Sequence, residues 1–456
     1  MRDELTRVTL VYPYFRPSND NSIFRLPPLG LGYIAACLRE HDVSVQLVDC
    51  TFLDEATALQ KIRLSRPDIV GIQVMFSIKE KALRMAHALR KDAKLLVAGG
   101  PLPTSDPADF LDLFDVVVVG EGEQTMVDLV RAVHEGIRLE SVYGIAFKQN
   151  GQVRLTPARG FIEDLDEIPF PAREMFDNEA YKKYYSKSFG YSTTSVMTSR
   201  GCPFQCDFCS RPVFGNRFRS RSAGNVADEV EEVKKLGYER VWFADDCFTL
   251  NRKRLLDICQ ELTNRHVDVD WECLSRVDTV DSEVAENMKR AGCVRVFFGI
   301  ESGNDSILKL MKKEATTKQA KEAVNIFKKV GIQTGAFFIL GYPGENDRTI
   351  LDTVDFGSSL PLDYLSFTFP YPIPGTPLFE RVKNRMFCED WEEPEGFHIV
   401  KHKLLFRSDF SETKLKFAIF KGMTQFYIRK YLGRRGYNVL GRLFERLTDT
   451  VYNVLP

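Results

Sequence analysis

Short apolar runs alternate with amphipathic stretches along most of this chain, and this alternation limits its fold more than any other feature. Between residues 7 and 134, the runs rich in Val, Ile and Leu are residues 8–12, 43–48, 69–74, 95–98 and 116–119. The helical candidates that follow them begin near Leu29, Asp54, Ile78, Asp106 and Gln124. Strands this apolar are typical of a parallel sheet that is buried on both faces. The pattern predicts an α/β domain of five β-α repeats around a doubly wound sheet.

A hairpin and a proline-broken stretch follow these repeats. Asn150-Gly151 lies between the apolar runs 142–147 and 152–156, and this dipeptide tolerates positive φ at both central positions of a tight turn. Residues 164–171 are acidic and contain two prolines, so they cannot continue a helix or a central strand. We expect the hairpin to close the first domain and the acidic stretch to form a linker on the surface.

A second series of apolar runs begins near residue 195. The strand candidates are residues 195–199, 241–244, 269–274, 294–300, 334–340 and 364–369, with helical patterns near Val226, Lys253, Glu283, Lys318 and Thr349. Six β-α units predict a partial (β/α)6 barrel, whose chemistry lies at the carboxyl ends of its strands. The pattern is then irregular and becomes helical after about Thr413. The expected divisions are a first domain at 1–150, a linker at 151–193, the barrel at 194–385 and a mostly helical C-terminal region, for substrate binding or a lid, at 386–456.

Composition excludes several classes of protein. The 62 Lys and Arg residues against 63 Asp and Glu residues leave a formal net charge of -1, so no global positive field favours nucleic acid. The first residues run directly into an apolar strand without an export signal, and no stretch of 18 apolar residues is present. We therefore expect a cytoplasmic protein whose ten cysteines are thiols or metal ligands rather than disulfides.

Three of these cysteines carry the strongest chemical signal in the chain. Cys202, Cys206 and Cys209 have the spacing C-x-x-x-C-x-x-C in a loop directly after a predicted strand. A four-iron cluster normally takes four thiolates, so three thiolates leave one iron open to a ligand from outside the protein. The alternatives are three structural cysteines or part of a zinc site, which the lack of a nearby fourth Cys or His disfavours.

On this motif the chain resembles the radical S-adenosylmethionine (SAM) superfamily, whose motif has an aromatic residue, here Phe208, before the last cysteine. The resemblance implies that the three cysteines hold a [4Fe-4S] cluster whose free iron binds the amino and carboxylate groups of SAM. Residues 244–248, 299–303 and 338–345 are similar to the family's SAM-contacting segments and also follow predicted strands. The SAM-binding candidates are Phe208, Asp245, Asp246, Glu301, Ser302, Ile339 and Gly341. For an Asp at a strand end, capping of the next helix is the alternative.

The first domain resembles the flavodoxin- or Rossmann-like cobalamin-binding domain of one branch of this superfamily. That branch includes the anaerobic Mg-protoporphyrin monomethyl ester oxidative cyclase and the hopanoid-associated enzymes. Glycines at strand ends open the crevice at the carboxyl edge of such a sheet, although turn glycines without a ligand are the alternative. The cobalamin-binding candidates are Pro28, Leu29, Gly30, Ser77, Gly99, Gly100, Pro101, Thr104, Gly120 and Glu121. Residues 14–20 lack the Asp-x-His-x-x-Gly motif of some cobalamin proteins, so we expect no cobalt-binding histidine from this domain.

Weaker signals occur elsewhere. His398 and His402 are spaced to share a helix face but lack a nearby carboxylate, and Cys247 is a small buried hydrophobe or a SAM contact. Residues 417–455 interleave aromatic residues with a set of cations: Lys421, Arg429, Lys430, Arg434, Arg435, Arg442 and Arg446. This segment is a helix packed on the barrel, or it contacts an anionic substrate or, as a peripheral contact, a membrane.

The resemblance implies a cobalamin-dependent radical SAM methyltransferase that acts on an unactivated carbon. A 5′-deoxyadenosyl radical removes hydrogen from the substrate, methylcobalamin supplies the methyl group and a second SAM remethylates cobalamin. The alternatives are a non-methylating oxidative cyclase or rearrangement enzyme, and a cobalamin or redox sensor without turnover. The expected partners are a small-molecule, lipid or peptide substrate and an external electron donor such as flavodoxin or ferredoxin under anaerobic conditions, with no nucleic acid.

Overall fold

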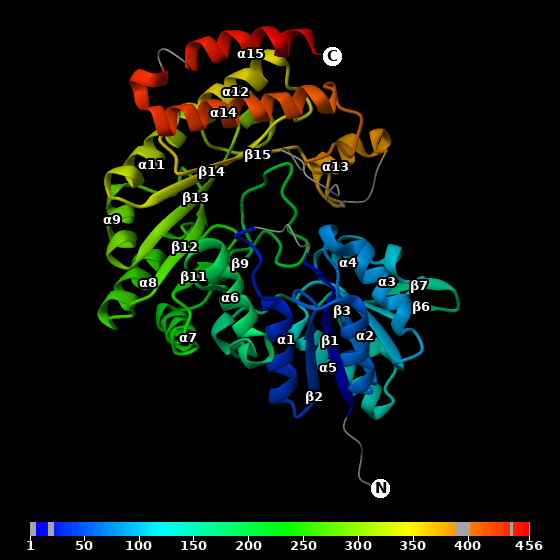
Figure 1. Cartoon of the computed structure of the whole chain (residues 1–456). Coiled ribbons are helices and arrows are strands. Elements are labelled where there is room, and N and C mark those ends of the chain that lie inside the picture. The colour runs from blue at the N-terminus through cyan, green and yellow to red at the C-terminus, as the bar shows by residue number, and fades with distance from the viewer. Residues whose placement is uncertain (1–5, 17–21, 388–401, 438–440, 456) are drawn as a thin grey trace.

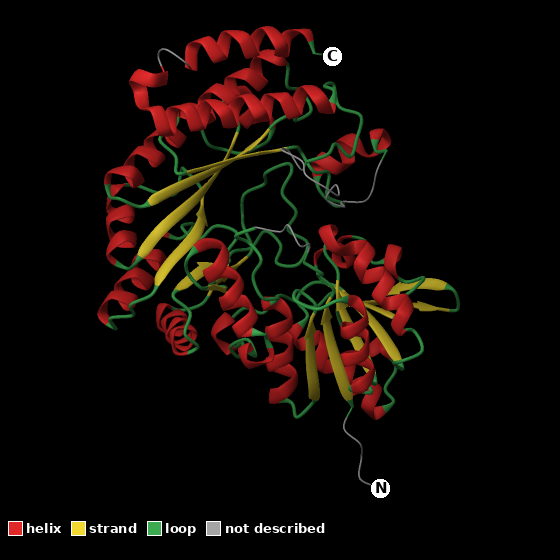
Figure 2. Cartoon of the chain, in the orientation of Figure 1, coloured by secondary structure: helices red, strands yellow, loops and turns green. Residues whose placement is uncertain are grey.

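The computed structural model of the chain describes residues 6–16, 22–387, 402–437 and 441–455. Two α/β halves lie side by side, and two long helices cover the outer side of the second half (Figure 1). Each half has one large sheet, and Figure 2 shows that helices cover both faces of the first large sheet but only the outer face of the second.

The N-terminal sheet is doubly wound, as predicted. Its strands lie in the order β2-β1-β3-β4-β5-β6-β7. The first five are parallel to one another, whereas β6 pairs antiparallel with both β5 and β7. Their bounds are β1 Arg7–Tyr12, β2 Ser44–Asp49, β3 Ile69–Gln73, β4 Leu95–Gly99, β5 Val116–Val118, β6 Ile145–Gln149 and β7 Gln152–Leu155. From β1 the chain first adds β2 on one side and then β3, β4 and β5 on the other, so the strand order reverses between β1 and β3. In this architecture the ligand crevice is expected at the carboxyl ends of these two strands.

The helices of this half follow the predicted alternation with one exception. They are α1 Leu29–Glu40, α2 Glu55–Leu64, α3 Lys79–Leu89, α4 Pro101–Ser105 and α5 Glu123–Glu135. The prediction of a helix beginning near Asp106 is wrong, because only the short α4 and a single 3-10 turn, Ala108–Phe110, occur there. Pro107 lacks an N–H group and disfavours the helical conformation at Asp106, which has φ −143° and ψ 81°, so α4 cannot continue.

The segment between the two halves is more ordered than a surface linker. It contains helix α6, Asn178–Phe189. Asp177 caps the N-terminus of this helix, because its side chain accepts a hydrogen bond from the N–H of Ala180. Tyr181 and Tyr185 of α6 are fully buried. Their hydroxyl groups donate to Asp49 at 2.7 Å and to the carbonyl of Ile23 at 2.8 Å, so this segment is attached to the first half.

The second half is the predicted partial barrel. Its parallel strands run in the order β15-β14-β13-β12-β11-β8, with bounds β8 Thr193–Val196, β11 Arg240–Phe243, β12 Asp270–Ser275, β13 Cys293–Glu301, β14 Gln333–Ile339 and β15 Tyr364–Thr368. The helices are α7 Ala223–Lys235, α8 Arg252–Asn264, α9 Ser282–Arg290, α10 Asp305–Leu310, α11 Thr317–Lys329 and α12 Asp347–Ser359. The predicted strand 195–199 is split, because β9, Ser199–Arg200, leaves the barrel and pairs antiparallel with β10, Arg219–Ser220. This short pair forms the base of the cysteine loop.

The C-terminal region is helical where it is described. It comprises α13, Pro377–Val382, then α14, Glu412–Gly436, and α15, Arg442–Val454. A non-helical residue, Gly433, interrupts α14. Helix α14 packs on α12, and α15 packs on α14 (Figure 1). No helix in the described part of the chain is both long and apolar enough to cross a membrane.

Candidate functional site

The cysteine loop, residues 201–218, is closed by contacts within itself. Gly201 has φ +81°, and a Cβ at this position would lie 2.3 Å from the carbonyl oxygen of Arg217, so only glycine fits. The Arg211 guanidinium donates to the carbonyl of Cys202 at 2.9 Å and also to the carbonyl of Phe204. The first part of the motif is therefore held in a fixed turn.

Asp207 attaches the middle of the loop to the barrel. Its buried carboxylate accepts hydrogen bonds from the hydroxyl of Tyr342 at 3.0 Å and from Arg381. Its N–H donates to the carbonyl of Met311 at 2.9 Å. The next residue, Phe208, packs in an apolar cluster that includes Ile339. Two of the SAM-binding candidates therefore lie together, beside the cysteines.

The three cysteines differ in exposure. Cys206 is buried, Cys202 is partly buried and Cys209 is exposed. Burial raises the pKa of the Cys202 thiol, so its thiolate needs a nearby positive charge of the kind that bound iron supplies. The described residues contain no group of three or more Cys, His, Asp or Glu side chains arranged around a single metal ion. The thiolates of a four-iron cluster bind separate irons, whereas those of a zinc site bind one ion.

Asp245 has a structural task at the start of the loop. Its carboxylate accepts from the N–H groups of Thr198 at 2.6 Å and Ser199 at 3.1 Å, and from both of their hydroxyl groups. It does not cap the next helix, because Asn251 caps α8. Asp246 lines the cavity described below. Of this pair, Asp246 lines the cavity, whereas Asp245 is not among its lining residues.

A buried ion pair lies at the carboxyl end of β13. The Nζ atom of Lys313 donates to Glu301 at 3.0 Å, and both side chains are buried. Burial alone would lower the pKa of Lys313, but the charge of Glu301 raises it above its ordinary value, so the ammonium group is charged. Ser302 is fully buried and lies 3.0 Å from the hydroxyl of Thr353. Sequence reasoning missed Lys313, because a basic residue after a helix is usually on the surface.

The turn after β14 is held by one carboxylate. The N–H groups of Gly341 and Tyr342 donate to Glu345 at 2.8 and 2.9 Å. Gly341 has φ +85°, and its missing Cβ would lie 2.6 Å from Leu415 of α14. The C-terminal helix therefore packs directly on this end of the barrel.

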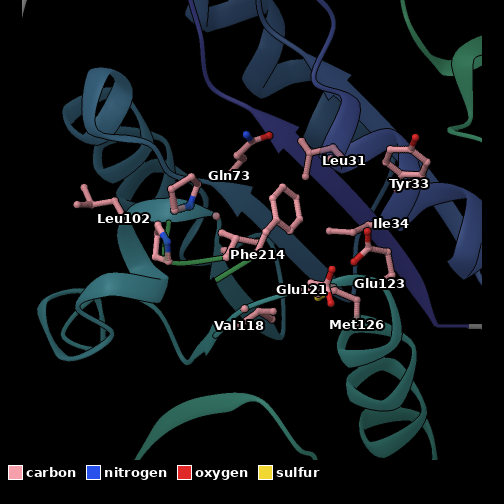
Figure 3. A pocket seen from close by; sticks show the side chains of 18 of the residues that line it. Leu31, Tyr33, Ile34, Gln73, Leu102, Val118, Glu121, Glu123, Met126 and Phe214 are labelled. Atoms are coloured by element: carbon pink, nitrogen blue, oxygen red, sulfur yellow. The ribbon is translucent and has the colours of Figure 1, made fainter. Parts of the chain in front are cut away.

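A cavity of about 430 Å³ lies at the carboxyl edge of the N-terminal sheet (Figure 3). Six of the cobalamin-binding candidates line it: Gly30, Gly99, Gly100, Pro101, Gly120 and Glu121. The other four, Pro28, Leu29, Ser77 and Thr104, are not among its lining residues. Of these, Thr104 supports the edge, because its hydroxyl accepts from the N–H of Gly120 at 3.1 Å.

The glycines of this edge leave room for a large group. Nothing lies within 4 Å of the position that a Cβ would take at Gly30 or Gly120. Gly100 has φ +109°, and a Cβ there would lie 2.8 Å from the carbonyl oxygen of Val74. The buried Oε1 atom of Gln73, on the cavity wall, has no hydrogen-bond partner among the described residues. Open glycine surface and an unpaired polar atom fit a large ligand such as cobalamin.

The opposite wall of the cavity belongs to the barrel half. It includes the residues directly after the last cysteine, 210–214, together with Asp246. The two walls are joined by buried ion pairs, in which Arg200 donates to Glu121 at 2.8 Å and to Glu123 at 2.5 Å. Arg219 also donates to Glu121, at 2.9 Å. Glu121 is therefore an interdomain partner, and the sequence did not indicate Arg200 because its partners are about 80 residues away.

The remaining candidates lie outside this cavity. No histidine of the described chain lines it. His402 lies 2.9 Å from the hydroxyl of Tyr371, whereas His398 is outside the described residues. Cys247 is buried, with its sulfur 3.7 Å from the hydroxyl of Thr249.

The fold and the site together define a class of two-domain enzyme. In this class the cysteine loop of the barrel faces a cofactor-binding cavity at the edge of the N-terminal sheet. Residues 196–357 match the Radical SAM superfamily, and residues 19–130 match the B12 binding domain. An uncharacterised methyltransferase from Pyrococcus horikoshii is 35% identical over 91% of this chain and 91% of that protein. The anaerobic magnesium-protoporphyrin IX monomethyl ester cyclase of Rubrivivax gelatinosus is 30% identical over 85% of this chain and 72% of the cyclase.

One solved structure has the same fold over most of the chain. The radical SAM methyltransferase TsrM of Kitasatospora setae, solved with cobalamin and a [4Fe-4S] cluster bound, matches with a TM-score of 0.70 and 20% identity. The match covers 84% of this chain and 75% of TsrM. The chain therefore belongs to the radical SAM superfamily and carries a B12 binding domain. It is a radical SAM enzyme whose cofactors are a [4Fe-4S] cluster, SAM and cobalamin, which confirms the predicted family.

Proposed function

We propose that the protein is a cobalamin-dependent methyltransferase that adds a methyl group to an unactivated carbon of a small molecule. The observation that carries the proposal is the shared cavity wall, in which residues 210–214 directly after Cys209 face the glycine edge of the N-terminal sheet. When bound, the cluster and SAM supply a carbon-centred radical, and cobalamin supplies a methyl group. A substrate in or beside this cavity would reach both.

The residues of the chain have distinct tasks in this proposal. Cys202, Cys206 and Cys209 bind three irons and leave the fourth to SAM. Glu301 and Lys313 present a carboxylate and an ammonium group at one strand end, which suits a ligand that carries both charges, such as the amino acid part of SAM. Phe208 and Ile339 form an apolar surface beside them, and Gly30, Gly99, Gly100 and Gly120 give the cobalamin crevice its open wall.

The decisive experiment is anaerobic turnover with methyl-labelled SAM, a low-potential reductant and extract of the source cells. We expect one labelled methyl group in a product, with one S-adenosylhomocysteine and one 5′-deoxyadenosine released for each product molecule. A product without the label would favour the cyclase alternative, for which the Rubrivivax relative is the support. The absence of product, S-adenosylhomocysteine and 5′-deoxyadenosine together would favour a sensor without turnover. Flavodoxin or ferredoxin is the proposed donor of electrons, and the cytoplasm is the proposed location.

We also propose a peripheral contact with an anionic lipid surface, through α15. Its outward face carries Leu443, Leu447, Val451 and Val454, which are 57%, 60%, 43% and 76% exposed. Their spacing of three or four residues places them on one side of the helix. Arg442 and Arg446 are exposed beside them, whereas the acids of α15 pair with Arg429 and Lys421. An apolar stripe next to cations that have no acidic partner among the described residues suits anionic lipid.

Sedimentation with vesicles tests this contact. We expect binding to phosphatidylglycerol vesicles that weakens with salt, little binding to phosphatidylcholine, and a loss of at least tenfold in the Leu447→Glu variant. Leu64→Glu, at a 74% exposed position on α2, is the matched control. Equal binding by Leu447→Glu and wild type would reject the contact. A dimer of the wild type that Leu447→Glu dissolves would instead assign the stripe to a second copy.

A further inference from the structure

Arg276 lies next to a predicted cluster ligand. It directly follows β12, and its Nη1 atom points at the sulfur of Cys206 at 3.9 Å. The guanidinium plane stacks on Phe204, with 3.4 Å between its central carbon and the ring centroid. Phe204 lies between the first two cysteines of the motif. Arg276 therefore contacts the cysteine loop through both a sulfur atom and an aromatic ring.

The other donors of Arg276 fix its orientation. Its Nε and Nη2 atoms donate to the two carboxylate oxygens of Asp278 at 2.9 and 2.7 Å, and Nη2 also donates to the carbonyl of Lys313 at 2.6 Å. The side chain is only 5% exposed. A planar guanidinium held on two edges has one edge left, and that edge is directed at Cys206.

We propose that Arg276 is a positioning residue that raises the reduction potential of the cluster through a charge-assisted N–H···S hydrogen bond to the Cys206 thiolate. This inference rests on the proposed binding of the cluster by the three cysteines. One electron enters the oxidised cluster on reduction, so the reduced cluster carries one more negative charge. A fixed cation at a ligating sulfur stabilises that form more than the oxidised form. The residue thereby makes the reduced cluster accessible to a donor of moderate potential.

A matched control lies in the same loop. Arg211 is also a guanidinium that holds the cysteine loop, but it donates to the backbone carbonyls of Cys202 and Phe204 and not to a sulfur. A general loosening of the loop should therefore appear in both Arg211→Met and Arg276→Met. The change in potential should be larger in Arg276→Met than in Arg211→Met, because of these two arginines only Arg276 donates to a cysteine sulfur.

The test measures iron content first and the midpoint potential second, by equilibrium reductive titration followed by electron paramagnetic resonance. In Arg276→Met we expect full iron content and about a tenfold lower ratio of reduced to oxidised cluster at a fixed potential, which is a shift of about 59 mV for one electron. Arg276→Lys, which keeps the charge, should recover part of the shift. If Arg276→Met does not retain iron, the neutral but polar Arg276→Gln variant decides.

The outcomes separate the two claims. A full cluster with an unchanged potential in Arg276→Met or Arg276→Gln would overturn the tuning role and leave the cluster assignment intact. An equal shift in Arg211→Met would also overturn it. Full iron content in a Cys206→Ala variant would instead reject the cluster assignment on which the inference rests.

Discussion

The two parallel sheets present chemically different edges to the region between the domains. The carboxyl edge of the N-terminal sheet is lined by glycines and apolar side chains, among them Leu31, Val118 and Met126 (Figure 3). The carboxyl edge of the barrel is lined by buried charges in pairs, such as Glu301 with Lys313 and Arg276 with Asp278. The first edge offers a bound molecule mainly shape and backbone contacts, since its acids Glu121 and Glu123 pair with Arg200 across the domains, whereas the second edge offers charged groups from the barrel itself. One molecule thereby suits two cofactors of unlike chemistry.

The largest expected effect that separates the two edges is a loss of bound iron when one cysteine of the barrel loop is replaced. Cys206→Ala is expected to reduce iron from about four per chain to near zero and to remove the charge-transfer absorption of the cluster, because a thiolate ligand is lost. Cobalamin content should be unchanged, since the glycine edge is intact. Iron and cobalt analysis of anaerobically reconstituted protein measures both. Loss of both metals together would show that the two edges do not act separately.

The reciprocal change is at Gly30. Gly30→Leu should reduce the cobalt content at least tenfold and leave iron unchanged, because its side chain would enter space that is now open and would not strain the helix. Gly160→Leu is the control, since that position is also open but does not line the cavity. A cobalt content equal to that of wild type in Gly30→Leu would contradict the assignment of the crevice.

A smaller effect concerns the ion pairs that join the edges. Arg200→Met should lower the free energy of unfolding by about 3–5 kcal/mol, because Glu123 would remain buried without its ion-pair partner and Glu121 would keep only Arg219. The exposed Arg252, which pairs with Asp281 and Glu283, is the comparison, and Arg252→Met should change stability little. Chemical denaturation followed by circular dichroism measures the difference. Equal changes in the free energy of unfolding would show that the interdomain pairs stabilise the protein no more than an exposed pair does.

The smallest effect concerns pH and the barrel edge alone. Burial raises the pKa of Glu345 to about 8, above the value near 4.3 of an unfolded chain. The folded state then binds more protons than the unfolded state between these values, so stability falls as the pH rises. Deprotonation of Glu345 alone should lower the free energy of unfolding by about 2 kcal/mol between pH 6 and pH 8. In Glu345→Gln that part of the slope of unfolding free energy against pH should disappear, and an unchanged slope would assign it to other groups.

The family, the fold class and the cofactors were predictable because their signals are local. The spacing of Cys202, Cys206 and Cys209 lies within eight residues, and apolar runs mark each buried strand. The partners of charged residues were not predictable. Arg200, Arg276 and Lys313 lie at the site because strands far apart in sequence end at one edge. The same reason explains why the arginine partners of Glu121, which also lines the cavity, were not predictable.

The tail shows the same limit. Its interleaved cations suggested a single basic face, but Lys421 is buried between Asp355 and Asp449, and Lys430 donates to the carbonyl of Asp363. Only tertiary packing decides which cations of an amphipathic segment remain free. Proline chemistry also overrode the periodicity near Asp106, where the expected helix is absent.

The pairing of Arg200 with Glu121 and Glu123 has a consequence for how the protein matures. The N-terminal half leaves the ribosome first and can fold as a unit. At that stage the carboxylates of Glu121 and Glu123 have no partner from the barrel half. Arg200 arrives later and immediately precedes Gly201 and Cys202. The residue that docks the later half on the earlier one is thus separated from the first cysteine of the motif by Gly201 alone. We therefore expect cluster insertion to be favoured in chains whose two halves have already docked.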